Sequence, residues 1–453
     1  MKSIGIIHYQ VGRTDGVSLE IEKWKQVLEK RGHQVHLCAG DLATAEGTAI
    51  EELYHHRPEV SRLYRNTFEA LTDYGDDGAY RADLYRVAEV IERRVCEFVE
   101  DKGIDLLIPE NIWSVAVNPA AAIALTRVMR DHQIPALGHH HDFYWERETG
   151  VALTCRTALE LAEKFLPPRG PDVTHTVINS IAQQELAERK GIDAAIVPNV
   201  FDFESPAWAK DEYNRDFRER IGLREKDVMI LQATRITPRK GIELAVDLVQ
   251  ALNTPERRRR LQGYGLYDAR AFDEDSRIVL VLAGYARDDL SGNYLERLKA
   301  RVERAGIEAL FIEDLVEARR QSRAGAKIYS LWDTYVFADL VTFPSLEEGW
   351  GNQFLEGTRA RQPVVIFEYP VFQSDIKASG FQVISLGGEL EGHDELGLAR
   401  VPQERVEAAA DHAVAMLTDP ALRQEAVETN SEIGRRHYSL EALDRHLAAL
   451  IPD

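Results

Sequence analysis

The chain has 453 residues, a formal net charge of −20 and an apolar content of 44%. This length exceeds what a single hydrophobic core usually serves, so we expect two large domains. The strong negative charge argues against nucleic-acid binding, which needs a basic surface, and against a polybasic lipid-binding patch.

The cysteines and the apolar runs indicate the cellular compartment. Cys38, Cys96 and Cys155 are far apart and form no CxxC pair, so neither a zinc site nor a disulfide framework is indicated. A reducing cytoplasm fits this usage. No apolar run approaches the length of a membrane span, and no signal-like segment precedes the first predicted strand. We therefore expect a cytoplasmic protein without stable membrane insertion.

The first forty residues predict a strand, a helix and a second strand. Residues 4–9 form an apolar run that is typical of a buried strand. A polar turn leads into residues 17–30, which have the spacing of an amphipathic helix, and residues 34–38 are again strand-like. This order is typical of the start of a Rossmann-like domain.

The remaining elements alternate in the same way. Residues 42–103 look mainly helical, and a linker is expected at 203–211. Two long helices are predicted at the end of the chain, at 402–418 and 420–450. The further predicted strands are 104–109, 134–138, 173–178, 195–200, 228–233, 278–284, 310–314, 339–343 and 383–386.

Three consecutive histidines follow one of these strands. Adjacent residues on an extended chain point alternately to opposite sides, so we do not expect His139, His140 and His141 to converge on one metal ion. No metal site is predicted. Further on, Trp145 is suited to stack on a sugar face, and Arg147 to bind an acidic group. A structural ion pair is the alternative for Arg147.

Two cations flank the turn after the strand at 228–233. Arg235 and Lys240 can close on one ligand beside a helix start. A diphosphate leaving group needs such cations, because negative charge builds on the phosphate as the bond breaks. The neighbouring Arg239 is expected to be a surface residue.

A strand, a glycine-containing loop and a helix make up residues 340–363. Glycine lets the backbone approach a ligand, and the loop amides and the helix N-terminus attract anions or sugar hydroxyls. Glu348 and Glu356 lie eight positions apart and can face one pocket, where carboxylates accept hydroxyl hydrogen bonds. Asn352 is expected to cap the helix. An ordinary turn is the alternative, although burial alone would not place Trp350 there.

This segment resembles the signature of glycosyltransferase family 4, a Glu-x7-Glu pattern with Pro-Ser upstream. The matching residues are Pro344, Ser345, Glu348, Gly349, Gly351 and Glu356, followed by Pro-Val-Val from Pro363. The resemblance implies the α/β GT-B fold, with two Rossmann-like domains facing each other across a cleft and a C-terminal helix that crosses back. It implies an acceptor domain at 1–203 with 436–453, and a nucleotide-sugar domain at 204–435.

The resemblance also implies a role for each candidate residue. Arg235 and Lys240 would stabilise the diphosphate, Glu356 would hold the ribose, and Glu348 would hold the transferred sugar. His141 would act from the acceptor side. Gly16 lies in a turn that resembles the family's N-terminal glycine loop, with Asp15 in place of one glycine; a plain turn is the alternative. The implied donor set is Gly16, Arg235, Lys240, Glu348, Gly349, Trp350, Gly351, Asn352 and Glu356, and the acceptor set is His141, Asp142, Trp145 and Arg147.

The predicted function is therefore retaining hexosyl transfer from a GDP-, UDP- or ADP-hexose to a small hydroxylated or anionic acceptor. The loop sequence Gly-Trp-Gly-Asn-Gln-Phe-Leu-Glu, together with Tyr369-Pro370-Val371-Phe372 and Asp375-Ile376, looks most like the branch that includes mannosylglucosylglycerate synthases and sucrose-phosphate synthases. This resemblance suggests a compatible-solute acceptor. No cofactor is expected, and no metal, because two side-chain cations carry the charge. The alternatives are a polysaccharide or lipid-linked oligosaccharide transferase, a phosphorylase, and a nucleotide-sugar-binding protein without turnover. The oligomeric state stays open.

Overall fold

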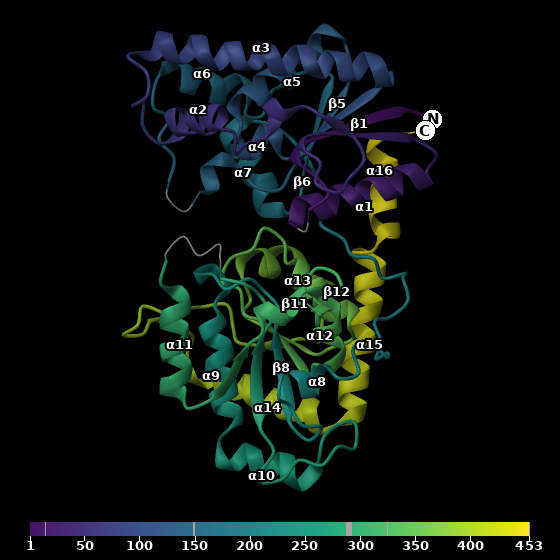
Figure 1. The fold of residues 1–453 in the computed structure, drawn as a ribbon, viewed down its shortest axis with the longest axis vertical. Helices are drawn as coiled ribbons and strands as arrows, with labels where there is room; N and C mark the ends of the chain where they lie inside the picture. The colour runs from purple at the N-terminus through teal and green to yellow at the C-terminus, as the bar shows by residue number, and fades with distance from the viewer. Residues whose placement is uncertain (14, 148–149, 287–291, 324, 453) are drawn as a thin grey trace. The chain divides into compact units, whose positions relative to one another are not determined.

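The computed structural model describes residues 1–13, 15–147, 150–286, 292–323 and 325–452 (Figure 1). The chain divides into two compact units. The first unit is Met1–Val200 with Leu440–Asp453, and the second is Phe201–Ser439. Each unit is built around its own parallel sheet, as the predicted alternation of strands and helices requires.

The first unit contains a seven-stranded sheet in the order β3-β2-β1-β4-β5-β6-β7, with every pairing parallel. Its central strands are buried on both faces, which explains why β4 and most of β1 are apolar in the sequence, whereas β5 ends in two buried histidines. The strands are β1 Ser3–Gln10, β2 Gln34–Asp41, β3 Thr48–Ala49, β4 Leu106–Pro109, β5 Ala136–His140, β6 Val173–Val177 and β7 Ala195–Ile196.

Helices complete this unit, and the last of them comes from the end of the chain. Leu443 and Leu447 of α16 pack in one apolar cluster with Ile21 and Trp24 of α1, and Figure 1 shows the two helices side by side. The helices are α1 Gly16–Lys30, α2 Pro58–Phe68, α3 Asp77–Lys102, α4 Ile112–Val115, α5 Pro119–Asp131, α6 Arg156–Phe165, α7 Ser180–Lys190 and α16 Leu440–Leu450.

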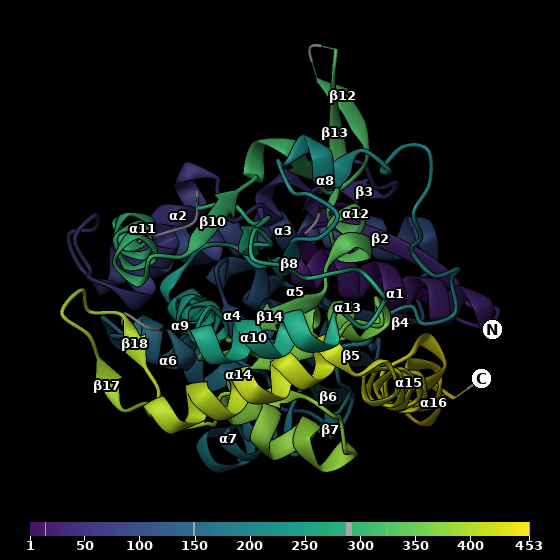
Figure 2. The ribbon, with the colours of Figure 1, turned by 90° about the horizontal axis from the view of Figure 1, so that it is seen from below.

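The second unit has a six-stranded parallel sheet in the order β10-β9-β8-β14-β15-β16. Two small sheets accompany it, β11-β13-β12 and β17-β18, and Figure 2 shows the antiparallel strands β12 and β13 of the first projecting from this unit. The strands of the second unit are β8 Val228–Gln232, β9 Ile278–Leu282, β10 Glu308–Phe311, β11 Val316–Glu317, β12 Gln321–Arg323, β13 Ala326–Ser330, β14 Leu340–Phe343, β15 Val364–Ile366, β16 Ile384–Ser385, β17 Gly392–His393 and β18 Ala399–Arg400.

In the second unit α9, α12, α13 and α14 contact the main sheet, and α8, α10, α11 and α15 pack on those helices. The helices of this unit are α8 Phe217–Arg220, α9 Ile242–Leu252, α10 Pro255–Tyr264, α11 Tyr294–Ala305, α12 Leu331–Phe337, α13 Asn352–Arg359, α14 Gln403–Thr418 and α15 Pro420–His437. None of the helices in the described part of the chain combines the length and the apolar composition that crossing a bilayer would take.

Two regions differ from the sequence-based expectation. The segment predicted as mainly helical at 42–103 also contains the short strand β3. The single helix predicted at 420–450 is wrong, because α15 ends at His437 and α16 begins at Leu440. The interruption lies at the boundary between the units, where the backbone carbonyl of Tyr438 accepts a hydrogen bond from the Phe201 N–H at 2.8 Å.

Candidate active site

The loops that follow β8 and β14 are held together. The two strands are parallel neighbours, with Leu340 beside Ile230, so their carboxyl ends reach the same edge of the sheet. The N–H of Leu346 in the second loop donates to the carbonyl of Arg239 in the first, at 2.8 Å. Open α/β sheets bind ligands at this edge.

Lys240 and Glu348 form a largely buried ion pair between these loops. The ammonium group of Lys240 donates to Glu348 Oε1, and the two side chains are 4% and 9% exposed. Burial pushes the pKa of Glu348 upward, but the positive charges of Lys240 and Arg239 outweigh it and hold the pKa below its usual value. Burial lowers the pKa of Lys240 despite its pairing with Glu348. The paired carboxylate is therefore ionised at neutral pH.

Two arginines accompany this pair. Arg239 Nη1 lies 3.4 Å from Glu348 Oε2, so this residue, expected on the surface, also contacts the carboxylate. Arg235 is exposed, and its positive charge contributes to lowering the pKa of Lys240. The structure thus brings Arg235, Lys240 and Glu348 into one electrostatic neighbourhood.

The glycine loop is fixed by Tyr369. Its hydroxyl donates to the carbonyl of Trp350 at 2.6 Å. Gly351 has a φ of +127°, and a Cβ there would lie 2.2 Å from the Tyr369 hydroxyl. Only glycine fits this position. Gly349 is partly buried in the same loop.

Two expectations for this loop were wrong. Trp350 is buried, with its ring centroid 5.4 Å from that of Tyr438, so burial does account for its presence. Asn352 is not the helix cap, since α13 begins at Asn352 and Gly351 occupies the capping position. The positive φ of Gly351 turns the chain directly into the helix.

Glu356 lies in the second turn of α13 and is buried. The hydroxyl of the buried Tyr335 donates to Glu356 Oε2 at 2.8 Å, and this contact fixes the carboxylate. Glu348 and Glu356 therefore have different partners: a lysine and an arginine for the first, and a tyrosine for the second.

The first unit places His141 against the carboxylate of Glu110, which follows the predicted strand at 104–109 but was assigned no role in the site. His141 Nε2 lies 2.7 Å from Glu110 Oε1, and both groups are buried. Burial alone would lower the pKa of His141, but the hydrogen bond and charge of Glu110 raise it above its usual value. The side-chain carbonyl of Asn111 accepts from the backbone N–H groups of His141 and Asp142, at 3.1 and 3.2 Å. Asp142 is exposed.

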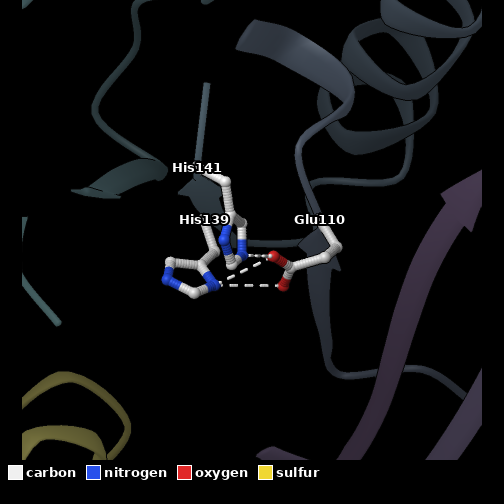
Figure 3. A group of neighbouring side chains, drawn as sticks. All are labelled: Glu110, His139 and His141. Carbon is white, nitrogen blue, oxygen red and sulfur yellow. Dashed lines mark hydrogen bonds and ion pairs between the residues drawn. The ribbon is translucent and has the colours of Figure 1, made fainter. Parts of the chain in front are cut away.

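His139 and His140 point to opposite sides of the strand, as the alternation of an extended chain predicts. His140 Nε2 points the other way and lies 2.9 Å from His175 Nδ1. His139 shares the side of His141, and its Nδ1 lies 3.2 Å from Glu110 Oε2 (Figure 3). The pairing of Glu110 with His139 and His141 was not among the predictions. The available signal was the place of Glu110 directly after a buried strand.

Trp145 and Arg147 have different surroundings. The Trp145 ring stacks on Phe143, with centroids 4.4 Å apart, and its Nε1 donates to Glu185. The guanidinium of Arg189 also lies over the ring at 5.4 Å. These contacts give Trp145 a packing role that does not fit the predicted sugar stacking.

Arg147 is inserted among aromatic rings. Its guanidinium carbon lies 4.4 Å from the ring centroid of Tyr64 and 4.5 Å from that of Phe68, and Nη2 donates to the Val115 carbonyl. Within the described ranges, no carboxylate forms an ion pair with it, and Nη1 is buried without a hydrogen-bond partner. The alternative of a structural ion pair is therefore not supported there.

Gly16 is the first residue of α1, at the turn that follows β1. The carboxylate of Asp15 caps this helix by accepting from the Ser18 N–H at 3.0 Å. Asp15 thus replaces a glycine of the family pattern with a residue that stabilises the helix start.

Comparison with known proteins agrees with the resemblance in the loop. The family model described as "Glycosyl transferases group 1" matches residues 214–432. A mannosylglucosylglycerate synthase of Petrotoga mobilis is 38% identical over 92% of this chain and 94% of its own length. A mannosylglucosylglycerate synthase of Thermotoga maritima is also 38% identical, over 97% of both chains.

The fold has solved counterparts. The crystal structure of a glycosyltransferase from Rickettsia africae covers 99% of this chain and 98% of its own, with a TM-score of 0.63 and 12% identity. This similarity shows the fold and confirms the predicted GT-B architecture. The chain therefore belongs to the group 1 glycosyltransferases, in the family that includes the mannosylglucosylglycerate synthases, and is a glycosyltransferase.

Proposed function

We propose that this chain transfers a hexose, with retention of anomeric configuration, from a nucleoside-diphosphate sugar to a small soluble acceptor that carries a carboxylate. Full-length similarity at 38% identity to two mannosylglucosylglycerate synthases carries this proposal. The name of those relatives contains a glycerate, and we propose glucosylglycerate or a close analogue as the acceptor, with mannose as the hexose.

The donor would bind at the loops after β8 and β14. Arg235 and Lys240 would hold the diphosphate, and Glu356 would hold the ribose. Glu348 and the backbone amides from Gly349 to Asn352 would hold the transferred hexose. As the bond from the anomeric carbon to the diphosphate breaks, the acceptor oxygen bonds to that carbon on the same face. Its proton passes to a phosphate oxygen of the leaving group. The two cations neutralise the growing charge, so we propose that this step needs neither a metal nor a cofactor.

The acceptor would bind in the first unit. His141 would orient the acceptor or the hexose, and Arg147 would bind the carboxylate. The buried Nη1 of Arg147, which has no hydrogen-bond partner in the described part of the chain, supports this role. A guanidinium is well matched to a carboxylate because it donates two parallel hydrogen bonds.

We propose that the protein acts in the cytoplasm. All three cysteines are free thiols in the structure, as a reducing compartment would keep them.

The experiment is a transfer assay with GDP-mannose, UDP-glucose and ADP-glucose, each offered glucosylglycerate or the uncharged glucosylglycerol, in the presence of EDTA. We expect one donor to give an α-linked product with glucosylglycerate, read by NMR, and much slower transfer to glucosylglycerol. Arg147→Gln should abolish this preference, whereas Arg156→Gln, a change at an exposed arginine of the same unit, should keep it. Equal use of both acceptors by the unmodified protein would contradict the proposal.

A further inference from the structure

We propose that Glu110, His139 and His141 form a binding site for a divalent transition-metal ion of the Zn²⁺ class, within the first unit. Its three ligands belong to the first unit, whereas the proposed donor residues other than Gly16 belong to the second unit. The metal site shares His141 with the proposed acceptor site, and its test is metal binding by the protein and not transfer activity.

The fold brings these three side chains together in a simple way. Glu110 follows β4 and bridges to His139 in the neighbouring parallel strand β5. His139 and His141 are two positions apart, so the alternation of an extended chain directs both toward the same side. Figure 3 shows the two imidazole rings meeting the carboxylate of Glu110.

The donor atoms are already close to the spacing that a metal ion requires. The three ligand atoms lie within 4.8 Å of one another. His141 Nε2 is 2.7 Å from Glu110 Oε1, and His139 Nδ1 is 3.2 Å from Glu110 Oε2. Ligands at about 2.1 Å from a tetrahedral Zn²⁺ stand roughly 3.4 Å apart. The carboxylate and each ring need to separate by less than about 1 Å, and any pair of ligand atoms that stands near the 4.8 Å limit needs to approach, for one ion to be held by all three.

The ligand chemistry selects a class of metal. Two imidazole nitrogens with one carboxylate suit Zn²⁺, Co²⁺ or Fe²⁺, whereas Mg²⁺ and Ca²⁺ prefer oxygen ligands throughout. Three protein ligands leave a coordination position open for water or another oxygen ligand, as in catalytic zinc sites.

The surroundings favour a cation and hold one ligand in place. Glu20 is a second buried carboxylate whose negative charge acts on His141; its Oε1 is paired with Lys23, and its Oε2 has no hydrogen-bond partner in the described part of the chain. The ring of His139 stacks on the buried Trp24, with centroids 4.3 Å apart. Because Glu110 is buried, little solvent screens the charge of its carboxylate, so it attracts a divalent ion more strongly than an exposed carboxylate would.

The test uses the full chain, stripped with a chelator and dialysed, and two probes. Isothermal titration with Zn²⁺ gives the stoichiometry and affinity, and Co²⁺ reports the geometry through its visible absorption. His139→Gln and Glu110→Gln each remove one ligand. His140→Gln is the matched control, because it removes an equally buried histidine of the same strand that faces the other way. Circular dichroism without metal checks that each variant is folded.

We expect one Zn²⁺ per wild-type chain and a Co²⁺ spectrum of low coordination number. Affinity should fall at least about a hundredfold in His139→Gln and stay unchanged in His140→Gln. If His139→Gln does not fold, Glu110→Gln takes its place, and the same hundredfold loss of Zn²⁺ affinity is expected. The proposal is overturned if the wild type binds no Zn²⁺, which would make the cluster a hydrogen-bonded ion pair only, or if the ligand variants bind it as tightly as the wild type.

Discussion

The ammonium group of Lys240 is paired with the carboxylate of Glu348, although we predicted that the two would hold different parts of the donor. The pair joins the loop after β8 to the loop after β14. A bound diphosphate would compete with Glu348 for Lys240, and the released carboxylate would be available to a hexose hydroxyl. Donor binding and the placing of Glu348 are therefore coupled in the proposed mechanism.

Lys240→Ala should lower the turnover rate by roughly a hundredfold. Loss of one group that stabilises transition-state charge typically costs about 3 kcal/mol. Steady-state kinetics with saturating donor measures this. Arg239→Ala is the control, because Arg239 contacts the same carboxylate at 3.4 Å but is 35% exposed. It should change the rate only a few-fold, since exposed pairs contribute about 1 kcal/mol or less. Near-normal turnover in folded Lys240→Ala would remove Lys240 from the mechanism.

Glu356→Gln should weaken binding of the nucleoside diphosphate, with little effect on the subsequent chemical step. A hydrogen bond to a charged group contributes about 1.5–3 kcal/mol, so we expect at least about a tenfold rise in the dissociation constant. Tyr335→Phe, which removes the 2.8 Å hydrogen bond to Glu356, should have a smaller effect in the same direction. Calorimetric titration of the nucleotide measures both, and unchanged affinity in Glu356→Gln would exclude its ribose role.

Gly351→Ala should destabilise the glycine loop. The added Cβ would lie 2.2 Å from the Tyr369 hydroxyl, on a backbone with a φ of +127°. Overpacking of this kind typically costs about 1–3 kcal/mol. Gly263 is exposed in the last turn of α10, and a Cβ added there has nothing within 4 Å. Gly263→Ala should therefore leave stability unchanged or raise it. Denaturant unfolding compares the two, and equal stability of both variants would contradict the steric role of Gly351.

His175 should make the first unit less stable as the pH falls. Burial lowers the pKa of its imidazole to about 4, below the 6.5 of an exposed histidine. Between these two pKa values the unfolded chain binds a proton that the folded chain does not. The contribution of the neutral His175 to the free energy of unfolding is therefore complete above pH 6.5 and is lost as the pH falls toward 4. The loss amounts to about 3 kcal/mol by pH 4. Unfolding of His175→Gln should depend less steeply on pH than that of the wild type, and parallel curves would contradict this.

Much of the fold could be predicted because buried parallel strands are continuous apolar runs. β8, β9 and β14 are buried at every position and were evident from the sequence. The break between α15 and α16 was not predicted, although two signals were available: the basic last turn of α15, and Ser439, a residue type that favours helix starts, directly before α16.

The candidate site was only partly accessible from the sequence. Lys240 and Glu348 were identified from motifs in two loops, but their pairing depends on the adjacency of β8 and β14 in the sheet. Glu110 has no motif, and its partners His139 and His141 lie 29 and 31 positions away in the chain. Trp350 was misread because its partner Tyr438 comes from a remote helix end.

The most direct test of the account is a crystal structure of the chain with its nucleoside diphosphate. We predict the diphosphate oxygens within hydrogen-bonding distance of Arg235 and Lys240, and the ribose hydroxyls on Glu356. A diphosphate bound elsewhere, for example in the polar pocket of the second unit lined by Lys377 and Arg405, would contradict the assignment.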